Sequence, residues 1–349
     1  MTAVSLQPTR LRPVWLAGAL VVLAAAVLVG VLLGAAGLGW RHVLGELADR
    51  VPLVDVTSGL TDRQATILWE LRLPRVVLGA LVGGTLAIAG AAYQGVFRNP
   101  LADPYLLGAA AGAGLGATLV IAYGRALTGP IDPVPVAAFG GALAGVGLAY
   151  LVGRSVGGRS SAASLVLAGV AVAAFLTALQ TFVQQRNSDT LREVYTWILG
   201  RLGTTGWSEV LLIAPYVAVS SAVILVHGRL LDVLSVGDEE AGALGVRTGR
   251  VRFWVVLGAS LGTAAAVAVS GLIGFVGIIV PHIVRMVAGS SYRIVLPLSF
   301  LLGAAFLVFA DVIARTVAAP AELPIGVVTA FFGAPFFAVV LRTSRGLGT

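Results

Sequence analysis

The chain has 349 residues, of which 58% are hydrophobic and only 11% are charged, and its mean hydropathy is +0.97. Soluble domains are about 25% charged, so this composition excludes a soluble globular fold and indicates a protein embedded in lipid. All 23 basic residues are Arg and Cys is absent, which excludes a P-loop lysine, a thiolate metal site and a cysteine nucleophile. The net charge of +7 comes without a basic run or an aromatic platform, so no nucleic-acid partner is expected.

The apolar segments predict an all-α, polytopic membrane protein of about ten transmembrane helices, since roughly 20 apolar residues cross a bilayer. The first segment exceeds the apolar core of a signal peptide and is expected to be retained. The eighth is short and contains Pro281, so its limits are the least defined. The predicted spans are Val14–Leu38, Val76–Phe97, Tyr105–Tyr123, Val134–Val152, Ala162–Val183, Val210–His227, Phe253–Val269, Phe275–Val287, Ile294–Ala314 and Ile325–Leu341.

Arginine asymmetry gives the orientation, because cytoplasmic loops of membrane proteins are enriched in basic residues. With the N-terminus inside, thirteen arginines lie at cytoplasmic helix ends and five lie in short outside loops. A longer first outside loop adds five more, mixed with acidic residues. Both termini are therefore expected in the cytoplasm.

Two of the apolar segments resemble each other. The run VVLGALVGGTLAIAGAA from Val76 and the run VVLGASLGTAAAVAVSG from Val255 align without gaps, and Gly83 falls on Gly262. The first runs inward and the second outward, as in the inverted repeats of transporters. A chance match between two helices of similar composition is the alternative. Glycines four residues apart, as in GAGLG from Gly112, also predict close helix packing within one bundle.

The largest predicted cytoplasmic loop, Arg229–Phe253, is expected to form two short helices. Ser235 can cap the first, the acidic run Asp238–Glu240 suits its positive end, and Gly245 can end it. Thr248 can begin the second. Exposed helices between spans predict docking to a soluble partner, and a solvated connector is the alternative.

Residues 186–209 are too polar to span the membrane and are predicted to form an extracytoplasmic surface helix. Tyr195, Trp197 and Ile198 would reach the membrane interface. The helix would either cover the outer mouth of a pathway or only anchor the chain.

Ionisable groups are scarce inside the spans, where Asp311 is the main one. An ion-coupled carrier usually places such groups near the middle of the membrane. The three His residues are scattered, and we find no Ser-His-Asp grouping. The sequence therefore predicts no active site, no metal site and no cofactor, and an energy source on another polypeptide.

Four long motifs occur in one order: RLPRVVLGALVGGTLAIAGAAYQGVFRNPLADPYLLG, LSVGDEEAGALGV, GLIGFVGIIVPHIVR and ADVIARTVAAPAELPIGVVTAFFGAPFF. With them the chain resembles, over nearly its whole length, the FecCD-type (type II) permease subunits of ABC importers for iron-siderophores, haem and vitamin B12. The resemblance implies a second permease subunit, either another copy or a paralogue, and two ATP-binding cassette ATPase subunits. It also implies an extracytoplasmic substrate-binding protein.

The resemblance assigns roles to two sets of residues. Arg72 and Arg75 of RLPR and Arg315 of ADVIAR match arginines that meet glutamates of the binding protein in the vitamin B12 permease. The planar fork of Arg suits a carboxylate, and anchoring of the helix ends to headgroups is the alternative. The loop residues expected to couple to the ATPases are Ser235, Gly237, Asp238, Glu239, Glu240, Ala241, Leu244, Gly245 and Val246.

The sequence thus predicts a non-enzymatic, single-domain transmembrane permease over residues 1–349, in the cytoplasmic membrane of a bacterium. The expected substrate is an iron-siderophore or a related metal chelate, with vitamin B12 or haem as alternatives in the same architecture. The rival from another class is an ion-coupled secondary transporter that acts alone.

Overall fold

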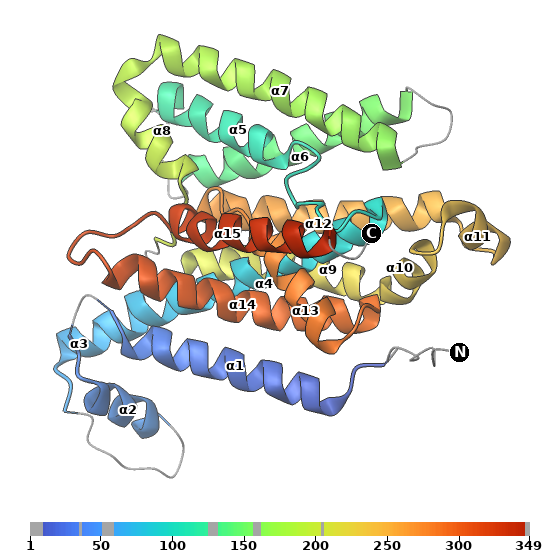
Figure 1. Cartoon of the computed structure of the whole chain (residues 1–349). Coiled ribbons are helices and arrows are strands. Elements are labelled where there is room, and N and C mark those ends of the chain that lie inside the picture. Colours follow the sequence, from blue (N-terminus) through green and yellow to red (C-terminus); the bar gives the residue numbers. More distant parts are fainter. Residues whose placement is uncertain are drawn as a thin grey trace.

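The computed structural model describes residues 10–34, 37–50, 59–124, 132–155, 162–203 and 206–345, which are helical and contain no strand. Long helices run side by side across Figure 1. Among these described residues, seven apolar helices have the length and composition to cross a membrane, and three more are shorter. The predicted all-α fold with about ten transmembrane helices is confirmed. These helices are α1 (Pro13–Leu32), α4 (Leu73–Phe97), α5 (Ala109–Tyr123), α6 (Pro133–Ser155), α7 (Ala162–Arg186), α9 (Ser208–Val226), α12 (Thr248–Ser270), α13 (Val276–Ala288), α14 (Tyr292–Thr316) and α15 (Ile325–Arg345).

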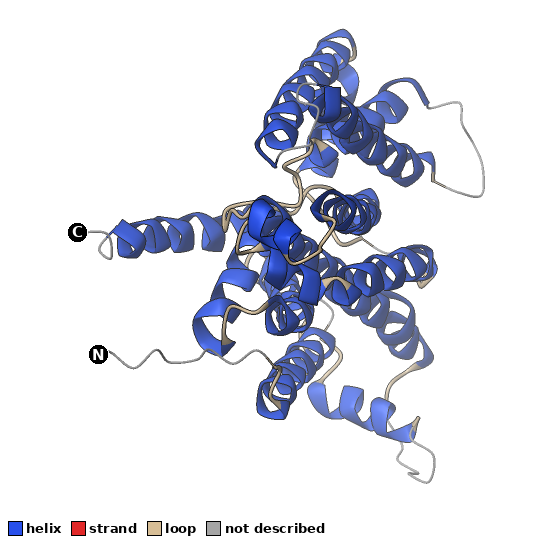
Figure 2. Cartoon of the chain, turned by 90° about the vertical axis from the view of Figure 1, so that its right-hand side faces the viewer, coloured by secondary structure: helices blue, strands red, loops and turns tan. Residues whose placement is uncertain are grey.

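The transmembrane helices form two groups. Helices α1, α4, α9, α12, α13 and α14 pack together, with α15 against α13 and α14, and α5, α6 and α7 pack together above them in Figure 1. The groups meet mainly where α12 contacts α6. Figure 2 shows the same separation from the end of the bundle.

Short helices lie at the two ends of the bundle. The arginine end, which holds Arg72, Arg75 and Arg315, also carries α2 (Trp40–Asp49), α3 (Asp62–Thr66), the π-helical turn η1 (Ile67–Arg72), the 3₁₀ turn η3 (Ser188–Thr190) and α8 (Leu191–Ile198). The opposite, loop end carries α10 (Gly228–Leu234) and α11 (Asp238–Ala243). Helix α1 begins and α15 ends at the loop end (Figure 1).

Backbone contacts between glycines hold the core helices close together. A Cβ on Gly90 of α4 would overlap the backbone of Gly277 on α13, and one on Gly83 would overlap the Gly303 carbonyl on α14. Gly112 of α5 meets the Gly141 carbonyl of α6 in the same way. The predicted close packing of small residues is confirmed, and it lets helix backbones approach closely where lipid supplies no hydrophobic driving force.

Two spans are broken inside the bundle. Helices α5 and α13 begin after non-helical segments, residues 99–108 and 271–275. These segments touch, because the Tyr105 hydroxyl donates to the Ile273 carbonyl at 2.9 Å and accepts from the Ile273 amide at 3.1 Å. Unwound backbone at this depth is tolerated only where protein or an aqueous cavity satisfies it.

The two segments that resemble each other in sequence have matching surroundings. Helices α4 and α12 pack antiparallel, with Tyr93 bonded to Ser260 at 2.6 Å and Thr85 against Gly262. Each is followed by a non-helical segment and then by a short helix, α5 or α13. This arrangement agrees with an inverted repeat.

Several predicted boundaries need correction. Helix α1 ends at Leu32 instead of Leu38, and the Arg72 guanidinium donates to the Val31 and Leu32 carbonyls of its last turn. The third span begins at Ala109 instead of Tyr105. Within residues 186–209 the helix α8 is only eight residues long, and Trp197 is buried in the bundle instead of facing the interface.

Candidate docking and coupling sites

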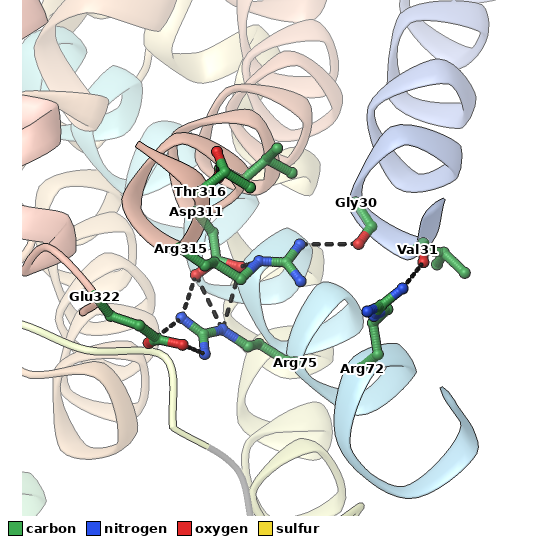
Figure 3. A network of polar contacts seen from close by, with 9 residues as sticks. Gly30, Val31, Arg72, Arg75, Asp311, Arg315, Thr316 and Glu322 are labelled. Carbon is green, nitrogen blue, oxygen red and sulfur yellow. Dashed lines mark hydrogen bonds and ion pairs between the residues drawn. The ribbon is translucent and has the colours of Figure 1, made fainter. Parts of the chain in front are cut away.

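The RLPR motif places Arg72 and Arg75 on adjoining turns where η1 passes into α4. Pro74 lies just after the π-helical turn η1, inside the continuous helix Asp62–Phe97, where it can donate no backbone hydrogen bond to the preceding turn. Across the interface lies the last part of α14, whose Asp311 and Arg315 are one helical turn apart. Figure 3 shows these side chains converging between α4, α14 and the end of α1.

Arg75 binds two carboxylates. Its Nε and one terminal nitrogen donate to Asp311 Oδ1 at 3.1 and 2.9 Å, and its two terminal nitrogens donate to Glu322 at 3.0 and 2.9 Å. The Asp311 side chain is 3% exposed, whereas that of Glu322, in the connection from α14 to α15, is 48% exposed. Arg75 therefore joins a buried partner to a surface partner.

Arg72 and Arg315 stabilise the end of α1. Arg315 donates to the Gly30 carbonyl at 2.8 Å, and Arg72 donates to the Val31 carbonyl at 3.0 Å. Arg315 also pairs with Asp311 at 3.0 Å. The last turn of α1 has no basic residue of its own, so these arginines supply the positive charge that favours a helix C-terminus.

The three predicted docking arginines are therefore together but not equivalent. Arg72 and Arg315 are about 5% exposed, and Arg75 presents part of its side chain at the surface, beside Glu322. The hydrogen bonds of Arg72 and Arg315 go to protein carbonyls, which disfavours headgroup anchoring for these two. Asp311, considered above as an intramembrane carboxylate, is neutralised by the cluster and is poorly suited to carry a coupling ion.

The loop end is organised by Asp232 on α10. Its carboxylate accepts from the Tyr292 amide at 2.6 Å and from the Ser291 hydroxyl at 2.8 Å, and it pairs with Arg293. It thus caps α14 from another helix, which satisfies an amide that the helix itself leaves unpaired. The loop is fastened to the start of α14.

Asp238, at the start of α11, joins the same loop to α12 and α4. It accepts two bonds from the Arg252 side chain, both at 3.1 Å, and lies 3.8 Å from Arg98 at the end of α4. Arg252 is buried, so its charge depends on this partner.

The exposed surface of the loop combines charge with apolar side chains. Glu239 and Glu240 are exposed, and Val236 and Leu244 are 64% and 70% exposed. Two large apolar side chains beside two carboxylates, outside the apolar spans, suit contact with another protein. Ala241 is fully buried below them and supports this surface.

The predicted capping of the loop was wrong in part. Ser235 does not cap α11 but donates to the Asp232 carbonyl at the end of α10, and Gly237 is the residue before α11. Gly237 has φ of +144°, a conformation that favours glycine. Gly245, with φ of +81°, ends α11 as predicted, and the Val246 amide bonds back to the Ala241 carbonyl. Thr248 begins α12 and not a separate short helix.

Sequence reasoning missed Glu322, Asp232 and Arg252. Their partners lie far along the chain or on another element, as with the 247 residues that separate Arg75 from Glu322. Only Arg252 gave a local signal. It lies at the start of an apolar helix, and an arginine buried there requires a carboxylate partner.

The described fold and its two polar ends define a multi-pass membrane permease with no catalytic grouping in the described residues. A model of the FecCD transport family matches residues 20–343. The chain therefore belongs to the FecCD family, the non-enzymatic permease subunits of ABC importers.

Relatives and a solved structure agree with this assignment. The cobalamin import system permease protein of Halobacterium salinarum is 41% identical over 306 residues, 88% of this chain and 80% of that protein. The Fe(3+)-citrate import system permease protein YfmD of Bacillus subtilis is 38% identical over 319 residues, which cover 89% of this chain and 92% of that protein. A metal-chelate type ABC transporter, solved in an inward-facing conformation, matches with a TM-score of 0.80 and 28% identity over 95% of this chain and 100% of that chain.

Proposed function

We propose that the chain is the membrane subunit of a binding-protein-dependent importer that moves an iron-siderophore or a related metal chelate across the cytoplasmic membrane. Its partners are a second permease subunit, two ATP-binding cassette ATPases and an extracytoplasmic binding protein. The relatives named above act on cobalamin and Fe(3+)-citrate, and both are metal chelates. Their shared chemistry supports a chelate as substrate.

The separation of two polar sites at opposite ends of the same helices carries this proposal. At the arginine end, Arg75 offers positive charge to an acidic partner. At the loop end, Glu239, Glu240, Val236 and Leu244 offer a mixed charged and apolar surface. One end fits an extracytoplasmic binding protein and the other fits an ATPase. In this proposal the start of α1 and the end of α15 lie on the cytoplasmic side together with α10 and α11.

The geometry refines the docking role of the arginines. Arg75 is the direct contact for a glutamate of the binding protein, and Glu322 holds the same guanidinium until that partner arrives. Arg72 and Arg315 position α1 and Asp311 beneath it. Charge at such a rim mainly sets the register and rate of association.

Reconstitution in lipid vesicles tests the proposal. Uptake of iron-siderophore should require the ATPase, ATP and the cognate binding protein together. Uptake by this chain alone, driven by an ion gradient, would refute the importer assignment and support the alternative function, an ion-coupled secondary transporter. Vitamin B12 is the second candidate, favoured by the 41% identity to a cobalamin permease, and haem is the third. Competition among the three labelled ligands in the same vesicles decides between them.

A further inference from the structure

We propose that the N-terminus of α5 and the Gln180 side chain of α7 form a contact site, here named the α5 site, for the oxygen atoms of an anionic chelate. This inference rests on the proposed function and specifies where the cargo is held and by which chemistry. The observations that carry it are the depth of the α5 start, its free amides and an unpaired buried amide side chain.

The start of α5 lies near the middle of the bundle. Gly108, which precedes α5, packs against Val172 and Ala173, close to the centre of α7. The other end of α5 is level with the end of α7, where the Asn187 side chain donates to the Tyr123 hydroxyl at 2.9 Å. The two helices run in the same direction, and α5 covers only the half of α7 nearer the arginine end.

The first turn of α5 has free hydrogen-bond donors. The amides of Ala109, Ala110 and Ala111 have no acceptor within the helix, since the first intrahelical bond runs from the Gly112 amide to the Gly108 carbonyl. No side chain caps this terminus. Ala110 and Ala111 border a hollow of about 430 Å³ between α5, α7 and α8. At this depth the donors require a ligand or water within the hollow.

Gln180 borders the same hollow one turn further along. Its side chain is 8% exposed, packs against Gly114 of α5 and forms no hydrogen bond to any described residue. Its amide group is not fully enclosed by protein, so it can reach the hollow that Gln180 lines. Its position beside the free amides of α5 indicates a bound group that both can contact.

Helix α7 has two distinct faces. Thr177, Gln180, Thr181 and Gln184 lie three or four residues apart and line the hollow, so they share one face. The opposite face presents Phe175 and Phe182, which are 61% and 59% exposed and suit lipid. The polar face therefore belongs to a hydrated or ligand-filled passage instead of the bilayer.

The electrostatic field at the start of α5 favours anions. The lining has no Asp or Glu to repel one and no Arg or Lys, and the start of α5 carries the positive end of a helix dipole. The other broken helix offers no such site, because Pro104 and Gly90 pack against Gly277 in the first turn of α13. Discontinuous helices in transporters present their N-termini to anionic substrate groups in this manner.

The test replaces Gln180 by Glu, which keeps its size and adds negative charge. The permease is reconstituted with its ATPase and binding protein, and four ligands are supplied: ferric citrate and haemin, which carry carboxylates, and a ferric trihydroxamate and cobalamin, which do not. The parent should prefer a carboxylate chelate. In Gln180→Glu its uptake should fall about tenfold, roughly 1.4 kcal/mol, and the deficit should grow with pH as the new carboxyl ionises.

The matched control is Gln185→Glu, the same change at an exposed glutamine of α7 that does not line the hollow, which should leave uptake within about twofold. Three outcomes would overturn the α5 site. The parent could prefer an uncharged chelate, it could take up none of the four ligands, or Gln180→Glu could take up the carboxylate chelate at the parent's rate. ATP hydrolysis stimulated by the binding protein is measured in the same vesicles. Its absence in the parent refutes the importer function itself, whereas its presence with unaltered selectivity refutes only the α5 site.

Discussion

The surface contact between Arg75 and Glu322 yields a prediction whose sign is not intuitive. Replacing Glu322 by Gln removes an ion pair, yet it should strengthen binding-protein docking. Glu322 is 48% exposed and its bond to Arg75 is bidentate. An exposed pair contributes about 0.2–1 kcal/mol, and bidentate geometry favours the upper part of that range. Asp311 remains to neutralise Arg75 within the protein.

The stability of the Glu322→Gln permease should therefore fall by no more than about 1 kcal/mol. Docking of an acidic partner no longer has to displace Glu322, so its affinity should rise by up to about fivefold, the equivalent of roughly 1 kcal/mol. Removing Arg75 itself is a poorer test, because it leaves the buried Asp311 with fewer partners and can cost about 3–5 kcal/mol.

The measurement is the dissociation constant of the binding protein for the assembled transporter in lipid nanodiscs, at low and high salt. Thermal unfolding is followed in parallel. Glu193→Gln is the matched control, with the same loss of charge at an exposed site on the arginine end. Equal or weaker docking in Glu322→Gln, with normal behaviour of the control, would show that Arg75 is not the docking contact.

Three further predictions concern coupling and packing. Asp232→Ala should lower stability by about 1–2 kcal/mol in thermal unfolding, because α14 loses its cap, and Asn at this position should restore most of the loss. Lys at both Glu239 and Glu240 should weaken co-purification with the ATPase and lower stability only slightly, through the lost favourable charge at the start of α11; full retention of the ATPase would contradict the coupling role. Gly90→Ala should destabilise the bundle by about 1–3 kcal/mol through overpacking, whereas Gly140→Ala, which meets open space, should unfold like the parent.

The sequence predicted the spans because the length of an apolar run is a direct measure of what a bilayer requires. It also indicated the exposed loop between α9 and α12 and the glycine contacts. It placed the start of the third span at Tyr105 instead of Ala109, since residues 105–108 (YLLG) are apolar enough to belong to a span. Their unwinding depends on Tyr105 bonding to Ile273, 168 residues away.

The same limit applies to the arginine cluster. The family resemblance assigned Arg72, Arg75 and Arg315 to one docking site, but it did not indicate that two of them cap α1. That role depends on carbonyl groups, which every residue carries and no sequence pattern reveals. Glu322 is the only charged residue of the short connection 317–324, and nothing local distinguishes it from a solvated carboxylate.

Helices α4 and α14 link the two proposed sites physically. At the arginine end they meet through Arg75 and Asp311. At the loop end α4 terminates beside Asp238, and α14 is capped by Asp232. Between these points they pack backbone against backbone at Gly83 and Gly303, over about 37 Å for a helix of 25 residues.

A pair packed this tightly has little freedom to deform continuously, so a movement at one end is expected to shift the other as a rigid element. If both partners bias the same element, their binding is coupled, and the coupling is reciprocal. The factor by which nucleotide changes the affinity for the binding protein must then equal the factor by which the binding protein changes the affinity for nucleotide. In the Asp232→Ala transporter, where the loop is released from α14, both factors should move toward one together.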